Sequence, residues 1–364
     1  MRTKGTFLLL IALLCSQQLL AQETISMDWW NGLSSQWKEC FKNQLMWQEG
    51  DMTEAGLDSI QTLTAINCAG IDDFGDERFI NSLEPLRPLS NLEEIDCSYT
   101  YVKDLEPIAG HSIKKLVLSY SKVKDLTPLV QSPTLKELYL SGTSINSLAP
   151  IKSLSDLTLI DLFENTAFTD WESINHFSKL EVLSLENTKI ESLEAFSKLK
   201  KLKVLKFSFT KVADLSPIKK LKSMEQLHIQ KTAVTDLSPI RKMKYLQYLN
   251  ISENKIEDLS SLAKLNALTT LYLSNTGIEN LGPLQGKEQL YELTFSGTPV
   301  EDISALKNLP KLSILIFTES KVKSLKPIEQ LPSLTVLYFR DSNIDKQEIK
   351  SYQDSHPDIE TDFF

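Results

Sequence analysis

A series of aspartates offers the clearest potential for chemistry in this 364-residue chain. Each stands just before a short segment that we expect to be helical; the series comprises Asp104, Asp125, Asp214, Asp236, Asp258 and Asp302. A row of carboxylates could bind calcium, which prefers oxygen ligands. Each carboxylate could instead complement the positive N-terminal end of its own helical segment. We favour this second interpretation, and we predict neither a metal nor another cofactor.

The remaining reactive side chains show no catalytic pattern. The histidines lie far apart, without the spacing of metal ligands; they are His111, His176, His228 and His356. The sequence contains no glycine-rich phosphate loop, Cys-x-x-Cys pair, His-Glu-x-x-His helix or Gly-x-Ser-x-Gly turn. We therefore predict that the protein is not an enzyme. Its net charge of -9 also argues against a general nucleic-acid binder.

The first 22 residues, MRTKGTFLLLIALLCSQQLLAQ, predict a signal peptide. They show basic residues, an apolar run and a small residue in the order typical of secretory segments. We expect cleavage near Ala21 or Gln22 and export to the periplasm, the cell surface or the medium. A lipoprotein with lipid on Cys15 is less favoured, because Leu14 stands where a small residue is wanted. No stretch is long and apolar enough for a transmembrane helix.

A repeat of 22 residues organises most of the remaining chain. Its opening apolar residue recurs at steps of 21 to 23, at Leu92, Ile113, Leu135, Leu157, Leu180, Leu202, Met224, Leu246, Leu268, Leu290, Leu312 and Leu334. A degenerate unit precedes these twelve at Leu63 to Ile71. A fixed period of this length indicates stacked units that bury one continuous core.

Each unit opens with the pattern L-x-x-L-x-L, whose alternation predicts a strand with its apolar side chains on one face. A polar residue follows and is expected to turn inward and satisfy backbone groups; examples are Thr188, Thr210, Asn254, Thr276, Thr298 and Ser320. Next comes a segment such as AVTDLSPI. Serine or threonine before proline predicts a short helical turn that begins with a hydroxyl cap.

The pattern LxxLxLxxTxIxDLxPLxxL resembles the leucine-rich repeat, in the short-unit class of bacterial internalins and similar exported proteins. The resemblance covers residues 63–344. It implies an α/β right-handed solenoid, with a curved parallel sheet on the concave face and short helical or 3-10 segments on the convex face. It also implies a non-catalytic protein-binding module. One departure is that threonine or serine mostly replaces the asparagine that is usual after the strand.

Helical caps are expected at both ends of the solenoid, because an uncapped end would expose the apolar core. Residues 23–62 form the predicted N-terminal cap, with Ser34 or Ser35 capping a helix that presents Trp37, Phe41 and Leu45 on one face. We assign its tryptophans to packing rather than to binding. Residues 345–364 form the predicted C-terminal cap, where Asp345 and Glu348 have the spacing of a capping box.

Three cysteines remain after cleavage of the signal peptide, and an odd number does not suggest a disulfide framework. Cys68 and Cys97 occupy the same inward position of successive strands, so we expect buried thiols. Neighbouring strands lie about 4.8 Å apart, which makes a bridge sterically feasible. Cys40 from the cap could also approach. We favour free thiols.

Outward positions on the concave sheet carry unexpectedly many apolar and aromatic side chains. Ordinary β-propensity explains some of them, but a continuous apolar patch on a monomer often marks an interaction site. We predict binding of a protein partner by a monomer through Tyr139, Phe163, Phe209, His228, Tyr248, Tyr272, Ile316 and Tyr338. The alternative is a carbohydrate-binding protein that uses these aromatics as stacking platforms.

The unit that begins at Leu157 has one extra residue and lacks the proline. Aligning its ENTAF with the ENTKI of the next unit makes Phe163 the inserted residue. This alignment predicts a bulge at Phe163, either with a functional role or as a tolerated insertion.

Basic residues recur after the short helical segments of three consecutive units, at Lys198, Lys200, Lys201, Lys219, Lys220, Lys222, Arg241, Lys242 and Lys244. Dipole complementarity and solubility explain such a stripe. A docking edge for an acidic partner or an anionic glycan is the alternative, and we favour the first explanation.

Overall fold

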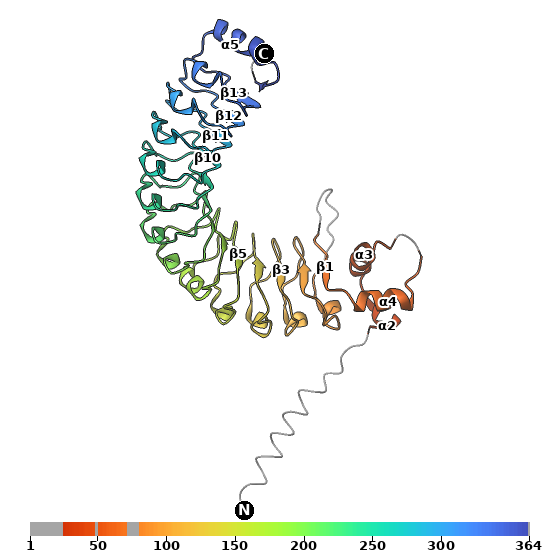
Figure 1. Ribbon diagram of the computed structural model, residues 1–364. Coiled ribbons are helices and arrows are strands. Elements are labelled where there is room, and N and C mark those ends of the chain that lie inside the picture. The colour runs from red at the N-terminus through yellow and green to blue at the C-terminus, as the bar shows by residue number, and fades with distance from the viewer. Residues whose placement is uncertain (1–24, 48–49, 71–79, 363–364) are drawn as a thin grey trace, which may run out of the picture.

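The computed structural model describes residues 25–47, 50–70 and 80–362. Strands line the inner, concave side of a curved array, and short helical segments lie on its outer, convex side (Figure 1). This arrangement confirms the predicted α/β solenoid. The signal peptide predicted over residues 1–22, with Cys15, lies outside the described residues.

One parallel sheet of 14 strands runs through the described residues in the order of the chain. The 22-residue period produces this order, because each unit returns to the sheet beside the unit before it. The strands are β1 Ala65–Asn67, β2 Glu94–Asp96, β3 Lys115–Val117, β4 Glu137–Tyr139, β5 Leu159–Asp161, β6 Val182–Ser184, β7 Val204–Lys206, β8 Gln226–His228, β9 Tyr248–Asn250, β10 Thr270–Tyr272, β11 Glu292–Thr294, β12 Ile314–Ile316, β13 Val336–Tyr338 and β14 Glu360–Thr361.

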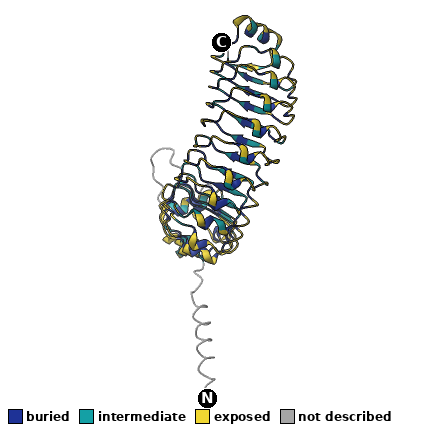
Figure 2. Ribbon diagram, turned by 90° about the vertical axis from the view of Figure 1, so that its left-hand side faces the viewer, coloured by how far each residue is buried: buried dark blue, intermediate teal, exposed yellow. Residues whose placement is uncertain are grey.

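The core lies between the sheet and the convex segments. The middle residue of a strand points inward, as at Leu227, Leu249 and Leu271, which are each 0% exposed. The residues on either side of it are mostly half-buried and face the concave side. The buried residues form a continuous layer along the array (Figure 2). The periodic leucines thus build one core, as the sequence predicts.

The polar residues predicted to turn inward after the strands are buried and hydrogen-bonded at Thr188, Thr210, Asn254, Thr276, Thr298 and Ser320. Thr188 and Thr276 donate their hydroxyls to the carbonyl oxygens of Leu185 and Leu273, at 2.6 and 2.7 Å. Asn254 donates to the carbonyl oxygen of Ile251 in its own turn at 2.9 Å, and also to that of Ile229 in the preceding unit at 2.7 Å. Threonine and asparagine therefore both satisfy the carbonyl group of their own turn, and the longer asparagine amide also joins two units.

Short 3-10 segments cover the convex side: η1 Glu84–Leu86, η2 Glu106–Ile108, η3 Thr127–Gln131, η4 Ala149–Ile151, η5 Trp171–His176, η6 Glu194–Phe196, η7 Ser216–Ile218, η8 Ser238–Ile240, η9 Ser260–Leu262, η10 Gly282–Leu284, η11 Ser304–Leu306 and η12 Lys326–Ile328. The predicted hydroxyl caps are wrong. The Asp236 carboxylate accepts the backbone N–H of Ser238 at 2.7 Å and its hydroxyl at 2.6 Å. The aspartate two residues before the serine thus accepts the backbone N–H at the start of the segment. The serine hydroxyl does not act as the cap, because it also donates to this aspartate.

Within the described residues, three α-helices precede the repeats: α2 Met27–Gly32, α3 Ser35–Gln44 and α4 Glu54–Gln61. The Ser34 hydroxyl caps α3 by accepting the backbone N–H of Trp37, one of the two caps predicted for this helix. Trp30, Trp37 and Phe41 are buried, so they pack within this cap. No helix of the described residues is long and apolar enough to cross a membrane.

A disulfide joins Cys40 of α3 to Cys68, which follows β1, with 5.3 Å between the Cα atoms. The prediction of free thiols is therefore wrong for this pair. Docking of α3 beside β1 brings Cys40 to the inward position after the strand, a contact that the odd cysteine count could not reveal. Cys97 is a buried free thiol, as predicted.

Helix α5, Lys346–Ser355, closes the other end of the array. Asp345 caps it by accepting the N–H groups of Gln347 and Glu348. Glu348 does not complete a capping box. Its carboxylate accepts the Ser324 hydroxyl and the Leu325 N–H, both at 2.7 Å, and so ties α5 to the last repeat.

The extra residue of the Leu157 unit lies beyond the strand, so the predicted bulge at Phe163 is wrong. The N–H of Gly142 donates to the Phe163 carbonyl at 2.8 Å, as expected for unbroken register. Asn165 is buried at the position that threonine holds in other units, with its amide 3.0 Å from the Thr143 hydroxyl. The insertion therefore falls between Asn165 and the buried Phe168.

Candidate functional site

The parallel register arranges the concave side chains in rows across the sheet. The first residue of each strand forms one row, in which Gln226, Tyr248 and Thr270 are neighbours. The third residue forms another row, in which His228, Asn250 and Tyr272 are neighbours. Side chains from different units thus gather on one surface.

His228, Tyr248 and Tyr272 form a continuous aromatic cluster over β8, β9 and β10. The ring centroids of His228 and Tyr248 lie 4.3 Å apart in a stacked arrangement. Tyr248 meets Tyr272 edge to face at 5.5 Å. Such pairs add about 0.5–1.5 kcal/mol beyond burial of their area, which holds the three rings in fixed relative positions.

Polar side chains surround this cluster on the concave side. Lys206 is the register neighbour of His228, and Thr294 is the neighbour of Tyr272 in the same row. Gln226 and Thr270 flank Tyr248 in the other row. An aromatic centre within a polar rim is the usual composition of a protein-binding surface.

Burial sets the protonation states of the cluster. Desolvation, with a smaller contribution from the Lys206 charge, lowers the pKa of His228 from 6.5 to about 4. The buried Nε2 of His228 has no hydrogen-bond partner in the described structure. Desolvation and hydrogen bonding with Glu292 raise the pKa of Tyr272. The cluster is therefore uncharged near neutral pH.

The other predicted concave residues lie away from this cluster. Tyr139 is on β4, where its hydroxyl donates to Glu137 at 3.2 Å. Ile316 and Tyr338 are register neighbours on β12 and β13, and the Tyr338 hydroxyl donates to Glu360. Phe163 follows β5 and is half-buried. The structure therefore distributes the eight predicted residues along the arc.

Phe209 belongs to the turn after β7 rather than to the sheet. Its backbone φ is 60°, and Lys231 lies 5.8 Å from its ring centroid. The ring is 42% exposed. Phe209 is thus an exposed aromatic beside the sheet, and no ring contact joins it to the aromatic cluster in the described part of the chain.

A second aromatic pair occupies equivalent turns near the N-terminal end. Tyr99 and Tyr120 stack with ring centroids 4.8 Å apart. The Tyr120 hydroxyl donates to Glu164 at 2.9 Å, two units further along. A Cβ atom at Gly142 would lie 2.4 Å from the Tyr120 ring, so only glycine at this position leaves space for the ring to extend towards Glu164. Tyr99, Tyr120 and Phe209 occupy equivalent positions of their units, and this recurrence is the signal in the sequence that could have found the pair.

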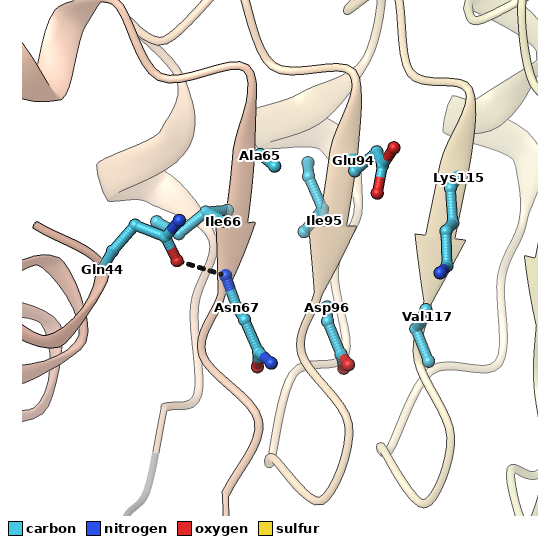
Figure 3. Close-up of a pocket in the computed structure, with 9 residues that line it drawn as sticks. All are labelled: Gln44, Ala65, Ile66, Asn67, Glu94, Ile95, Asp96, Lys115 and Val117. Carbon is cyan, nitrogen blue, oxygen red and sulfur yellow. Dashed lines mark hydrogen bonds between the residues drawn. The ribbon is translucent and has the colours of Figure 1, made fainter.

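A small pocket lies where α3 meets the first strands, and sequence reasoning missed it (Figure 3). Gln44 from α3 forms one wall and accepts the backbone N–H of Asn67 at 3.2 Å. Glu94, Asp96 and Lys115 contribute charges of both signs. Its volume of about 180 Å³ is close to that of a cavity that holds one benzene ring.

The aspartate row serves the convex segments. Asp104, Asp125, Asp214, Asp236, Asp258 and Asp302 each accept a backbone N–H two residues further on. These interactions confirm that the aspartates stabilise the starts of the segments. Across the described residues, no three histidine, cysteine, aspartate or glutamate side chains gather in a metal-binding group.

Comparison with known proteins agrees with this architecture. A family model for two copies of leucine-rich repeats matches residues 178–220, 222–264 and 246–286. The crystal structure of an internalin, InlF of Listeria monocytogenes, matches with a TM-score of 0.77 and 24% identity, over 91% of this chain and 95% of that chain. The chain has the leucine-rich-repeat fold of the internalins.

Other leucine-rich-repeat structures share the fold at lower identity. The functional domain of InlJ from Listeria monocytogenes matches with a TM-score of 0.64 and 19% identity, over 90% of this chain and 78% of that domain. The ectodomain of the Arabidopsis thaliana receptor kinase GASSHO1/SCHENGEN3 matches with a TM-score of 0.60 and 17% identity, over 77% of this chain and 36% of that one. It was solved in complex with CASPARIAN STRIP INTEGRITY FACTOR 2. No curated protein sequence matches significantly.

Proposed function

We propose that this leucine-rich-repeat protein is a non-catalytic module that binds a protein partner through its concave sheet. The aromatic cluster of His228, Tyr248 and Tyr272 carries this proposal. Its rings are held by mutual contacts, and polar side chains surround them in register. The plant receptor ectodomain, which was solved with a bound partner, supports the use of this fold for binding.

The cluster is suited to a protein partner because its rings are already fixed in place. Aromatic anchors near the centre of an interface commonly contribute about 2 kcal/mol or more each. Rigid side chains lose little further conformational entropy on binding. The neutral state of His228 also avoids desolvation of a charge at the centre of the interface.

We also propose that the protein works outside the cytoplasm. The signal peptide predicted over residues 1–22 motivates this proposal, and the Cys40–Cys68 disulfide supports it. Structural disulfides persist in oxidising compartments and are rare where cellular thiols stay reduced. The sequence favours the periplasm, the cell surface or the medium without choosing among them.

A paired variant tests the binding face. Tyr248→Ala with Tyr272→Ala removes two anchors, so we expect a partner to bind about 30-fold or more weakly. Tyr245→Ala with Tyr291→Ala is the matched control, because these tyrosines are 53% and 49% exposed and lie outside the cluster. Both pairs make the same change in composition.

The three proteins are immobilised and exposed to cell-envelope and host extracts, and retained proteins are identified and their affinities measured. A protein that binds the wild type and the control but not the cluster variant supports the proposal. Equal retention of every partner by the cluster variant refutes it. A glycan array is run in parallel to test the carbohydrate alternative. That alternative predicts that the wild type and the control bind a glycan that the cluster variant does not bind.

A further inference from the structure

Two adjoining grooves on the convex side carry a concentration of positive charge. One lies between η7 and η8 and the other between η8 and η9, with volumes of about 440 and 470 Å³. Ser238, Arg241 and Lys242 line both grooves, so the two form one continuous surface. The basic residues that line it are Lys219, Lys220, Lys222, Arg241, Lys242 and Lys264, all exposed. We call this surface the basic groove.

Among the described residues, no ion pair neutralises the charges of the basic groove, although the charge of Lys219 contributes to the lowered pKa of Asp214. Elsewhere, lysines pair with carboxylates of adjacent units, as in Lys114–Glu93 at 2.7 Å and Lys179–Asp156 at 2.7 Å. Among the described residues, none of the six basic side chains of the groove forms an ion pair. This concentration occurs in a chain whose net charge is -9.

Dipole complementarity, one of the two parts of the explanation favoured from the sequence, accounts poorly for this surface. The segments η7, η8 and η9 are each three residues long. So few aligned peptide groups produce only a small dipole, since the macrodipole builds up along a helix. Solubility or a ligand must therefore account for the six cations around these three segments.

The aspartates of the same units leave the basic groove available to an anion. Asp214, Asp236 and Asp258 lie before the three segments, and each accepts a serine N–H at 2.7 to 2.8 Å. Hydrogen bonds from the serine hydroxyls and backbone N–H groups lower the pKa of each carboxyl, so the groups stay ionised in their own turns. The basic residues follow the segments, which separates the two signs along each unit.

We propose that the basic groove binds an extended anionic polysaccharide. Its cations recur from unit to unit, which suits a polymer whose negative charges also recur. Serines of η7, η8 and η9 also line the basic groove; the hydroxyls of Ser238 and Ser260 donate to aspartates, so their oxygens can still accept hydrogen bonds from sugar hydroxyls. Pro239 and Ala263 are the apolar members of the lining. No aromatic side chain lines the grooves in the described structure. Interfaces with folded proteins usually contain an aromatic anchor, and sites for single-stranded nucleic acid usually contain aromatic rings on which bases stack.

Dextran sulfate is the probe, with uncharged dextran, polyglutamate and single-stranded DNA as comparisons. We expect the full-length protein to bind dextran sulfate, to lose affinity as salt rises, and to bind the other three at least about tenfold more weakly. Equal binding of polyglutamate or DNA overturns the assignment to a polysaccharide. Failure to bind dextran sulfate at low salt refutes the proposal that the basic groove is an anion-binding site.

Matched lysine variants locate the site. Lys219→Gln, Lys220→Gln and Lys242→Gln together should weaken binding of dextran sulfate by about tenfold or more, with a shallower salt dependence. Lys114→Gln, Lys179→Gln and Lys323→Gln remove the same charge at paired lysines and should change the affinity less than about twofold. Equal losses in the two variants overturn the proposal. The variant with Tyr248→Ala and Tyr272→Ala should bind dextran sulfate normally, so this test is independent of the proposed protein-binding face.

Discussion

Breaking the Cys40–Cys68 disulfide should loosen the N-terminal cap while leaving most of the repeats folded. The bridge closes a loop with a sequence separation of 28. A loop of this length restricts the unfolded chain enough to stabilise the protein by about 3–4 kcal/mol on the chain-entropy estimate. Cys40→Ala with Cys68→Ala removes this constraint. Other contacts still hold the cap, such as the bond from Trp37 Nε1 to the Ser82 carbonyl at 3.1 Å.

The location of the tryptophans makes the loss measurable. Trp29, Trp30, Trp37 and Trp47 belong to the N-terminal region, and Trp171 alone lies among the repeats. Tryptophan fluorescence therefore reports mainly on the cap, whereas circular dichroism reports on the whole array. Because each repeat contacts only its neighbours, the urea midpoint measured by fluorescence should fall further than the midpoint measured by circular dichroism.

Reduction provides the control for this prediction. Dithiothreitol should shift the fluorescence midpoint of the wild type to that of the double variant, and should leave the double variant unchanged. A loss of less than about 1 kcal/mol would show that the bridge does not constrain the unfolded chain as calculated. Equal shifts in both signals would show that the cap and the repeats unfold as one unit.

Two further predictions concern the core and the concave face. Leu249→Ala, at a position that is 0% exposed, should lower the free energy of unfolding by about 2–5 kcal/mol; a loss in urea denaturation no larger than that of the exposed Tyr291→Ala would contradict the inward register. Folding lowers the pKa of His228 from 6.5 to about 4, so the unfolded chain takes up this proton first and stability should fall as the pH drops from about 6.5 towards 4. His228→Gln should flatten this part of the curve of urea midpoint against pH, and an unchanged slope would show that His228 is not the group responsible.

The periodic features of the fold were predictable because each depends on one unit and its copies. The spacing of Leu227, Leu249 and Leu271 determines the strand, its inward face and its register at once. That register also places Tyr248 and Tyr272 on neighbouring strands, so their proximity followed from the period. The ring contacts of Tyr248 with His228 and with Tyr272 both run across the diagonal and depend on side-chain direction, which the period does not specify.

The features that sequence reasoning missed depend on contacts outside the period. Cys40 reaches Cys68 because α3 docks beside β1, and the cysteine count contains no information on this docking. The position of the insertion depended on whether Asn165 or Thr166 filled the buried turn position, and only the hydrogen bond to Thr143 decides it. Strand β14 has no leucine pattern, because it adds to the sheet from beyond α5.

The two proposed surfaces share repeat units but lie on opposite sides of the core. The aromatic cluster occupies β8, β9 and β10, while η8 and η9 of the same region line the basic groove. Between them lie fully or almost fully buried leucines such as Leu249 and Leu259. The inward leucines of each unit form the core that holds the solenoid together, so the residue types at outward positions are not constrained by folding. One short stretch of chain can therefore present an apolar, uncharged face to one partner and a cationic face to another, and neither ligand needs to displace the other.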